Sequence, residues 1–149
     1  MMMTDPLQFT VLGRPRPAGS KRPVVASNGR LRVVDSSGVK GQSWRSDVRD
    51  AAIRANDGKL AMLTGPLSLT VTFYLRRPKC HRCASGALKP DAPLYPTSKP
   101  DTTKLIRSIE DALTSVAWVD DALIVNQHGY KRFTHDVERA EVVIWRVTT

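Results

Sequence analysis

The chain has 149 residues, of which 41% are hydrophobic and 25% charged, so we expect one globular domain with its own core. Its apolar runs are too short for a membrane span, and its first residues lack the basic and apolar segments of a secretory signal, so we expect a cytoplasmic protein. Its 23 Lys and Arg against 14 Asp and Glu give a net charge of +9, which predicts a polyanionic partner: DNA, RNA or an acidic membrane surface.

The first half of the chain predicts a strand, a basic loop, a hairpin and a helix. Residues 7–12 alternate as a strand does, and residues 13–23 form a loop rich in Pro, Gly, Lys and Arg. Residues 24–34 suit a hairpin that turns at Asn28-Gly29. Apolar residues at helical spacing predict an amphipathic helix over 41–56.

The second half predicts a strand over 67–75, a long proline-punctuated loop over 76–99 and a helix over 102–116. Strands are expected over 123–132 and 138–147, joined by a polar turn. This order of elements predicts a single α/β or α+β domain over residues 1–149, with a mixed sheet flanked by two main helices.

Acidic residues at both ends of the second predicted helix are candidates for a metal site. Asp101 precedes the helix, Asp120-Asp121 follows it, and Arg107 lies within it. Carboxylates are the hard ligands that Mg²⁺ prefers, and a nearby cation stabilises charge on phosphorus during phosphodiester cleavage. The residues alone therefore predict a basic nucleic-acid binder with a candidate metal site.

Each of these residues also has a simpler structural interpretation. Asp101 is suited to capping the helix, and Asp120-Asp121 to forming a turn. Arg107 is spaced to pair with Asp111, and Glu110-Asp111 suits a solvated helix face.

The two cysteines, Cys80 and Cys83, form a CxxC pair in the long loop. Such a pair is half of a tetrahedral zinc site, and no second pair of ligands at suitable spacing follows. In a reducing cytoplasm we expect two free thiols, and zinc binding stays an alternative.

The segments Lys99–Thr114 and Val116–Val125 resemble the signature of the RusA family of Holliday junction resolvases, which reads roughly Pro-Asp-x-Asp-Asn-Leu-x-Lys, Asp-Ala-Leu, a short turn, Asp-Asp and a strand. The basic loop over 13–23 also resembles the Gly-x-Pro loop of that family. The resemblance implies a homodimeric, RusA-like endodeoxyribonuclease, common in phages and prophages, that nicks four-way DNA junctions. Residue by residue, it implies Asp101 and Asp121 as carboxylate ligands of Mg²⁺, or of Mn²⁺ as a substitute, and Arg107 as the catalytic cation.

Two positions depart from the family pattern. Thr103 stands where the family has a second carboxylate, and Lys104 stands where it has Asn. The missing negative charge is expected from Asp120, Glu110 or Asp111, with Asp120 preferred because it adjoins a matched ligand. Otherwise the site works with one ion, or the protein binds junctions without cutting them.

The resemblance implies a four-way DNA junction as the partner, with no nucleotide cofactor and no membrane. For a phage protein the compartment would be the host cytoplasm. A non-catalytic junction-binding protein, supported by Thr103, is the competing function. The cations expected to contact DNA phosphates are Arg14, Arg16, Lys21, Arg22, Lys99, Lys104 and Lys131.

Overall fold

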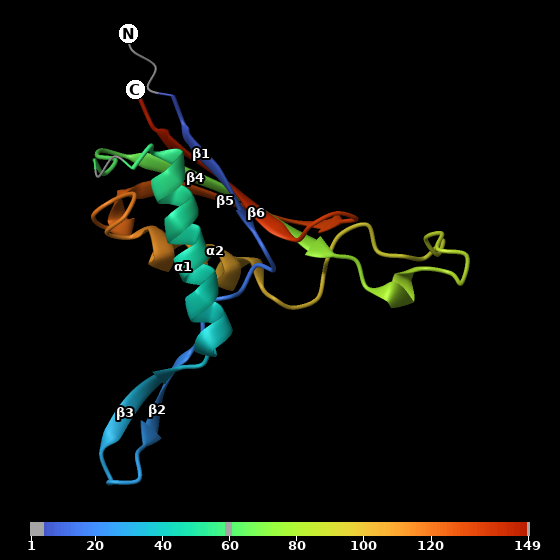
Figure 1. The fold of residues 1–149 in the computed structure, drawn as a ribbon, viewed down its shortest axis with the longest axis horizontal. Coiled ribbons are helices and arrows are strands. Elements are labelled where there is room, and N and C mark those ends of the chain that lie inside the picture. Colours follow the sequence, from blue (N-terminus) through green and yellow to red (C-terminus); the bar gives the residue numbers. More distant parts are fainter. Residues whose placement is uncertain (1–4, 59–60, 149) are drawn as a thin grey trace.

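Four strands form the main sheet, in the order β1-β6-β4-β5 (Figure 1). They are β1 (Leu7–Leu12), β4 (Leu67–Arg76), β5 (Ile124–Thr134) and β6 (Arg139–Arg146). β4 and β5 are parallel, and the other neighbours are antiparallel, so the sheet is mixed as expected. The computed structural model describes residues 5–58 and 61–148.

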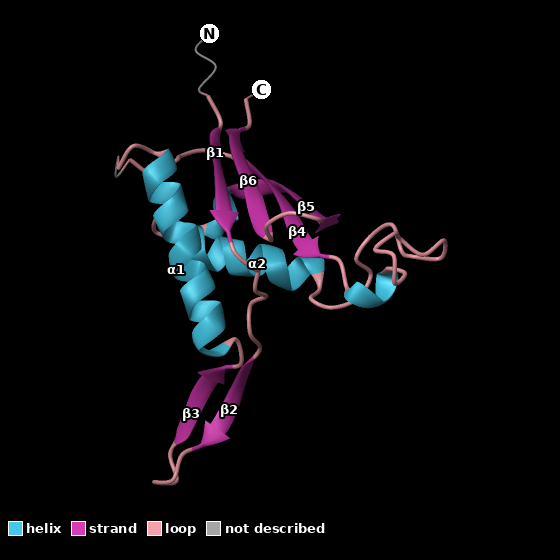
Figure 2. Cartoon of the chain, turned by 45° about the vertical axis from the view of Figure 1, so that its right-hand side comes forward, coloured by secondary structure: helices cyan, strands magenta, loops and turns pink. Residues whose placement is uncertain are grey.

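Two helices, α1 (Gly38–Ala55) and α2 (Thr102–Leu113), complete a two-layer α+β domain (Figure 2). Alternate residues of β4 point into the core between the layers, namely Leu67, Leu69, Val71 and Phe73, and all are fully buried. Burying such a side chain contributes about 1.5 to 3 kcal/mol. Leu75 shares this face and is also buried, whereas Ser68, Thr70, Thr72 and Tyr74 lie on the other sheet face and are partly exposed. Within the described residues, no helix is long and apolar enough to cross a membrane.

Two segments project from this domain in different directions (Figure 1). The arm is the hairpin of β2 (Lys21–Val25) and β3 (Leu31–Asp35), which turns at Gly29 with a φ of 75°. The lobe is residues 77–96, which lie between β4 and α2 and contain one short 3-10 helix, η1 (Lys79–His81). Because β4 and β5 are parallel, the chain must cross back between them, and the lobe and α2 form this connection.

The structure corrects three predicted boundaries. β2 begins at Lys21, so the end of the basic loop predicted over 13–23 is a strand, whose Pro23 is tolerated because a two-stranded ribbon has only edges. α1 begins at Gly38 and not at residue 41. α2 ends at Leu113 and not at residue 116, because Ser115 adopts a φ of 67°. The predicted strands over 7–12, 67–75, 123–132 and 138–147 are confirmed to within two residues at each end.

Candidate active site and nucleic-acid interface

Asp121 is the first residue of a short 3-10 helix, η2 (Asp121–Leu123), that follows α2. Its oxygen Oδ1 accepts hydrogen bonds from Trp118 Nε1, at 2.8 Å, and from Thr114 Oγ1. Trp118 is fully buried, so its indole holds this oxygen in place. Oδ2 accepts no hydrogen bond from any residue that the structure describes. Asp121 is therefore exposed and oriented, with one oxygen available to a cation.

The turn after α2 brings Asp121 back to the end of that helix. Ser115 interrupts the helix, and its N–H donates to Trp118 O at 2.7 Å. Thr114 Oγ1 also lies 2.9 Å from Glu110 O, so its single hydroxyl hydrogen is shared between Asp121 and this carbonyl of the last helical turn. This turn places Trp118 in the core and leaves Asp121 beside α2. Neither donor stands out in the sequence, where only the i, i+3 spacing of Trp118 and Asp121 signals their contact.

Glu110, in the last turn of α2, is the carboxylate that interacts with Asp121. Burial raises the pKa of Glu110, and the charge of Asp121 raises it further. A hydrogen bond from Gln127 Nε2 of β5 to Glu110 Oε1 opposes this rise. A carboxylate whose charge is disfavoured by a neighbouring carboxylate is a suitable half-site for a divalent cation, because the ion relieves their repulsion.

The other residues proposed to replace the missing charge lie differently. Asp120 caps η2, where its Oδ1 accepts a hydrogen bond from Ala122 N at 2.8 Å. Asp111 is exposed on α2, and within the described residues it forms no ion pair with Arg107. This hydrogen bond stabilises the start of η2, and a metal-binding role for Asp120 stays a prediction.

Glu110→Gln is expected to stabilise the metal-free protein at about pH 7. Because its folded pKa lies above the unfolded value, ionised Glu110 destabilises the fold above that pKa, by less than about 1 kcal/mol for a half-exposed group. This destabilisation fades as the pH falls through the raised pKa, so wild type and variant should converge at about pH 4. Thermal melts in EDTA at about pH 7 and about pH 4 measure the difference in stability and its disappearance, with exposed Asp136→Asn as control. A variant less stable than wild type at neutral pH would contradict the expectation.

Asp101 lies at the opposite end of α2, as its N-cap residue. Its backbone carbonyl accepts the hydrogen bond from Leu105 N, but its exposed side chain makes no capping hydrogen bond. The helix between Asp101 and Asp121 has 12 residues and a length of roughly 18 Å, so one chain does not bring these two residues together. Among the described residues, no three His, Cys, Asp or Glu side chains gather as a metal site.

Lys131 of β5 holds the segment that leads into Asp101. Its Nζ donates to Ser98 O at 2.9 Å and to Pro100 O at 3.0 Å. The Lys99–Pro100 bond in this segment is cis. Lys131 is half-buried, so these hydrogen bonds indicate a positioning role, and its contact with phosphate stays a prediction.

A hollow of about 370 Å³ lies beside Asp101. The loop after β1 forms one wall and is fixed to α2 by a hydrogen bond from Ala18 N to Lys104 O at 2.8 Å. The base of the arm forms another wall. Three of the predicted DNA contacts line the hollow together with Asp101, namely Arg14, Lys99 and Lys104. We call this space the first hollow.

The remaining predicted cations do not line the first hollow. Lys21 and Arg22 are exposed on β2 of the arm, and Arg16 is half-buried in the loop after β1. Arg107 is exposed on α2, between the Asp101 end and the Asp121 end of the helix.

Cys80 and Cys83 are exposed free thiols in the lobe. Their neighbour His81 packs edge-on against Phe133, with ring centroids 5.6 Å apart. Within the described part of the chain no third metal-binding side chain joins the two thiols. Zinc binding therefore gains no support from the arrangement of these residues.

Comparison with known proteins identifies similar sequences over nearly the whole chain. The family model described as Endodeoxyribonuclease RusA matches residues 15–145. The chain is also 28% identical, over 156 residues, to the uncharacterized protein YqaN of Bacillus subtilis (strain 168), an alignment that covers 97% of this chain and 99% of YqaN. The matched family range contains α2, Asp101 and Asp121.

Proposed function

The chain belongs to the RusA endodeoxyribonuclease family, and we propose that it is a magnesium-dependent homodimer that resolves four-way DNA junctions by paired nicks. The exposed stripe of α2 is the main support for this assignment. Helical spacing puts Lys104 and Arg107 on its N-terminal half and Glu110 and Asp111 on its C-terminal half. The cationic half adjoins Asp101 and the first hollow, and the acidic half adjoins Asp121.

This stripe is self-complementary between two copies of the chain. A two-fold axis perpendicular to α2 reverses the second helix, so Lys104 and Arg107 would face the partner's Glu110 and Asp111. The same symmetry would bring Asp101 of each protomer to the acidic end of the other helix. Three carboxylates would then meet at each of two equal sites, whereas a single chain brings only two together.

The carboxylates of this composite site fit a magnesium ion. Mg²⁺ prefers hard oxygen ligands and retains several waters, and the donor set of Asp101 with the partner's Glu110 and the partner's Asp121 supplies only oxygens. When bound, the ion activates a water and neutralises charge on the phosphate. Mn²⁺ suits the same ligands and is expected to substitute.

The protein side chains at this site would have separate tasks. Asp121 offers the oxygen that its two hydrogen-bond donors leave free. Arg107 keeps its charge at every working pH and would stabilise charge on phosphorus without donating a proton. The partner's Glu110 would supply the negative charge that Thr103 lacks. Arg14, Lys99 and Lys104 would hold the DNA backbone in the first hollow.

A cleavage assay on a synthetic four-way junction tests the proposed function. In Mg²⁺ or Mn²⁺ we expect paired nicks on opposed strands, no nicks in EDTA, and far slower nicking of a linear duplex of the same sequence. Binding should weaken steeply as salt is raised.

Thr103 supports one competing function, a junction-binding protein that no longer cuts DNA. A hydroxyl is a poorer magnesium ligand than a carboxylate, and Thr103 lies in the first turn of α2 beside Asp101. Tight junction binding without nicks in either metal, by a protein shown to be dimeric, would establish this function and refute the nuclease.

A further inference from the structure

We propose that the DNA backbone continues from the first hollow into a second basic hollow beneath the lobe, where Arg76 and Lys79 bind its phosphates; this site rests on the proposed function because its ligand is DNA. The second hollow has a volume of about 350 Å³ and lies between the end of β4, the lobe and the segment before α2. Arg14, Lys99 and Pro100 line both hollows, so the two are adjacent along one surface.

The charge of the second hollow favours a polyanion. Its walls contain one carboxylate, Glu138, and five cations, namely Arg14, Arg76, Arg77, Lys79 and Lys99. The ion pairs within the described residues, Arg45–Asp35 and Arg139–Glu141, both lie elsewhere. Glu138 Oε1 accepts a hydrogen bond from Arg76 N at 3.0 Å, so this carboxylate is engaged by the backbone. The cations therefore retain a positive potential that phosphates can neutralise.

The wall formed by the lobe is fixed to the sheet. The guanidinium of Arg77 lies over the ring of Phe133, 4.1 Å from its centroid, and donates to Pro93 O at 2.7 Å. Arg132 of β5 lies over the ring of Tyr95 at 5.0 Å, which fastens the returning part of the lobe. A site on a wall held in this way is preorganised, so binding DNA would order little additional chain.

Arg76 and Lys79 are the cations in this wall that remain free to bind a ligand. Both are exposed, and neither side chain forms a hydrogen bond or ion pair with another described residue. Arg77, between them, is occupied by its contacts with Phe133 and Pro93. Contacts from Arg76 and Lys79 to phosphate oxygens would lengthen the DNA footprint without reading sequence.

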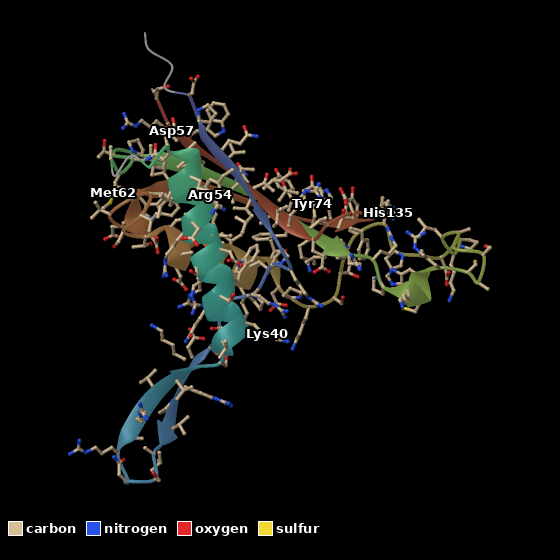
Figure 3. All side chains as sticks on the ribbon, viewed as in Figure 1. Lys40, Arg54, Asp57, Met62, Tyr74 and His135 are labelled. Atoms are coloured by element: carbon tan, nitrogen blue, oxygen red, sulfur yellow. The ribbon has the colours of Figure 1, made fainter. Side chains whose placement is uncertain are left out.

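The test compares two double variants, each of which loses two positive charges per chain. Arg76→Gln/Lys79→Gln removes the proposed contacts. Arg54→Gln/Arg146→Gln removes two charges at the end of the domain away from the lobe. Figure 3 labels Arg54 well away from His135, whose ring contacts Arg82 of the lobe. Junction affinity is measured by fluorescence anisotropy in Ca²⁺ over a salt series, and circular dichroism melts verify that both variants fold.

The Arg76→Gln/Lys79→Gln variant is expected to reduce the salt slope of log Kd by about 3.6, because the proposed dimer has two second hollows and each of the four lost phosphate contacts contributes about 0.9. Its affinity at about 0.1 M salt should fall by more than about tenfold, while the Arg54→Gln/Arg146→Gln control stays at the wild-type slope. Equal slopes for wild type and the first variant would overturn the second site. If the wild type binds junctions but never nicks them, the nuclease assignment fails alone, and the difference in slope still supports the second site.

Discussion

Asp121→Asn is expected to lower the rate of junction nicking on the order of a thousandfold while junction affinity stays within about threefold. An amide offers no anionic oxygen to Mg²⁺, so the site loses the ligand that the hydrogen bonds of Trp118 and Thr114 orient. Asn Oδ1 still accepts both hydrogen bonds, so the fold should be preserved. Single-turnover nicking and anisotropy in Ca²⁺ measure the two quantities. Exposed Asp47→Asn on α1 is the matched control.

A mixed dimer shows whether each active site belongs to one chain or to two. Asp101→Asn and Asp121→Asn protomers with different tags are co-expressed, and the heterodimer is isolated. In the composite arrangement, one of its sites has both substitutions and the other has neither, so about half of the wild-type nicking rate should return, as single and not paired nicks. An inactive heterodimer would refute the composite site, because sites within one chain would each contain one substitution.

Gly129→Val is expected to destabilise the domain by about 3 kcal/mol and to lower its melting temperature by roughly 6 to 12 °C. β5 packs against α2 at Gly129, where an added Cβ would lie 2.2 Å from Ile106 Cδ1 and 2.9 Å from Thr102 Cγ2. A larger side chain therefore requires the side chains of Ile106 and Thr102, or α2 itself, to shift. Asn126→Val, at an exposed position of the same strand, should change stability by less than about 0.5 kcal/mol.

A double-mutant cycle tests whether this clash is the cause. Ile106→Ala removes the atoms nearest to the added Cβ, and alone it should destabilise the core by about 2 to 5 kcal/mol. The double variant should be destabilised by at least about 1 kcal/mol less than the sum of the two single destabilisations. Additive free energies of unfolding from urea titrations would show that Gly129 matters for a different reason.

Local sequence patterns determined most of the secondary structure and the positive charge. The alternation of Leu67, Leu69, Val71 and Phe73 predicts one buried face of a strand, and the structure buries all four. The Asn28-Gly29 pair predicts the turn of the arm. Such features depend on neighbours a few residues apart, so they can be recognised without a fold. The sequence also implies that Asp101 and Asp121 of one chain lie far apart, because a predicted helix of this length separates them.

Only the tertiary structure decided which distant residues meet. The proximity of Glu110 to Asp121 depends on Ser115 ending the helix and on Trp118 entering the core, neither of which a local pattern specifies. The parallel pairing of β4 with β5 makes the lobe and α2 the crossover, and it places Lys131 behind the Asp101 segment and Gly129 beneath α2. These contacts join residues far apart in the chain, and the packing of the whole core selects them. Charge and spacing alone therefore left Glu110 as one of three candidates, with Asp120 preferred, and did not locate the second hollow.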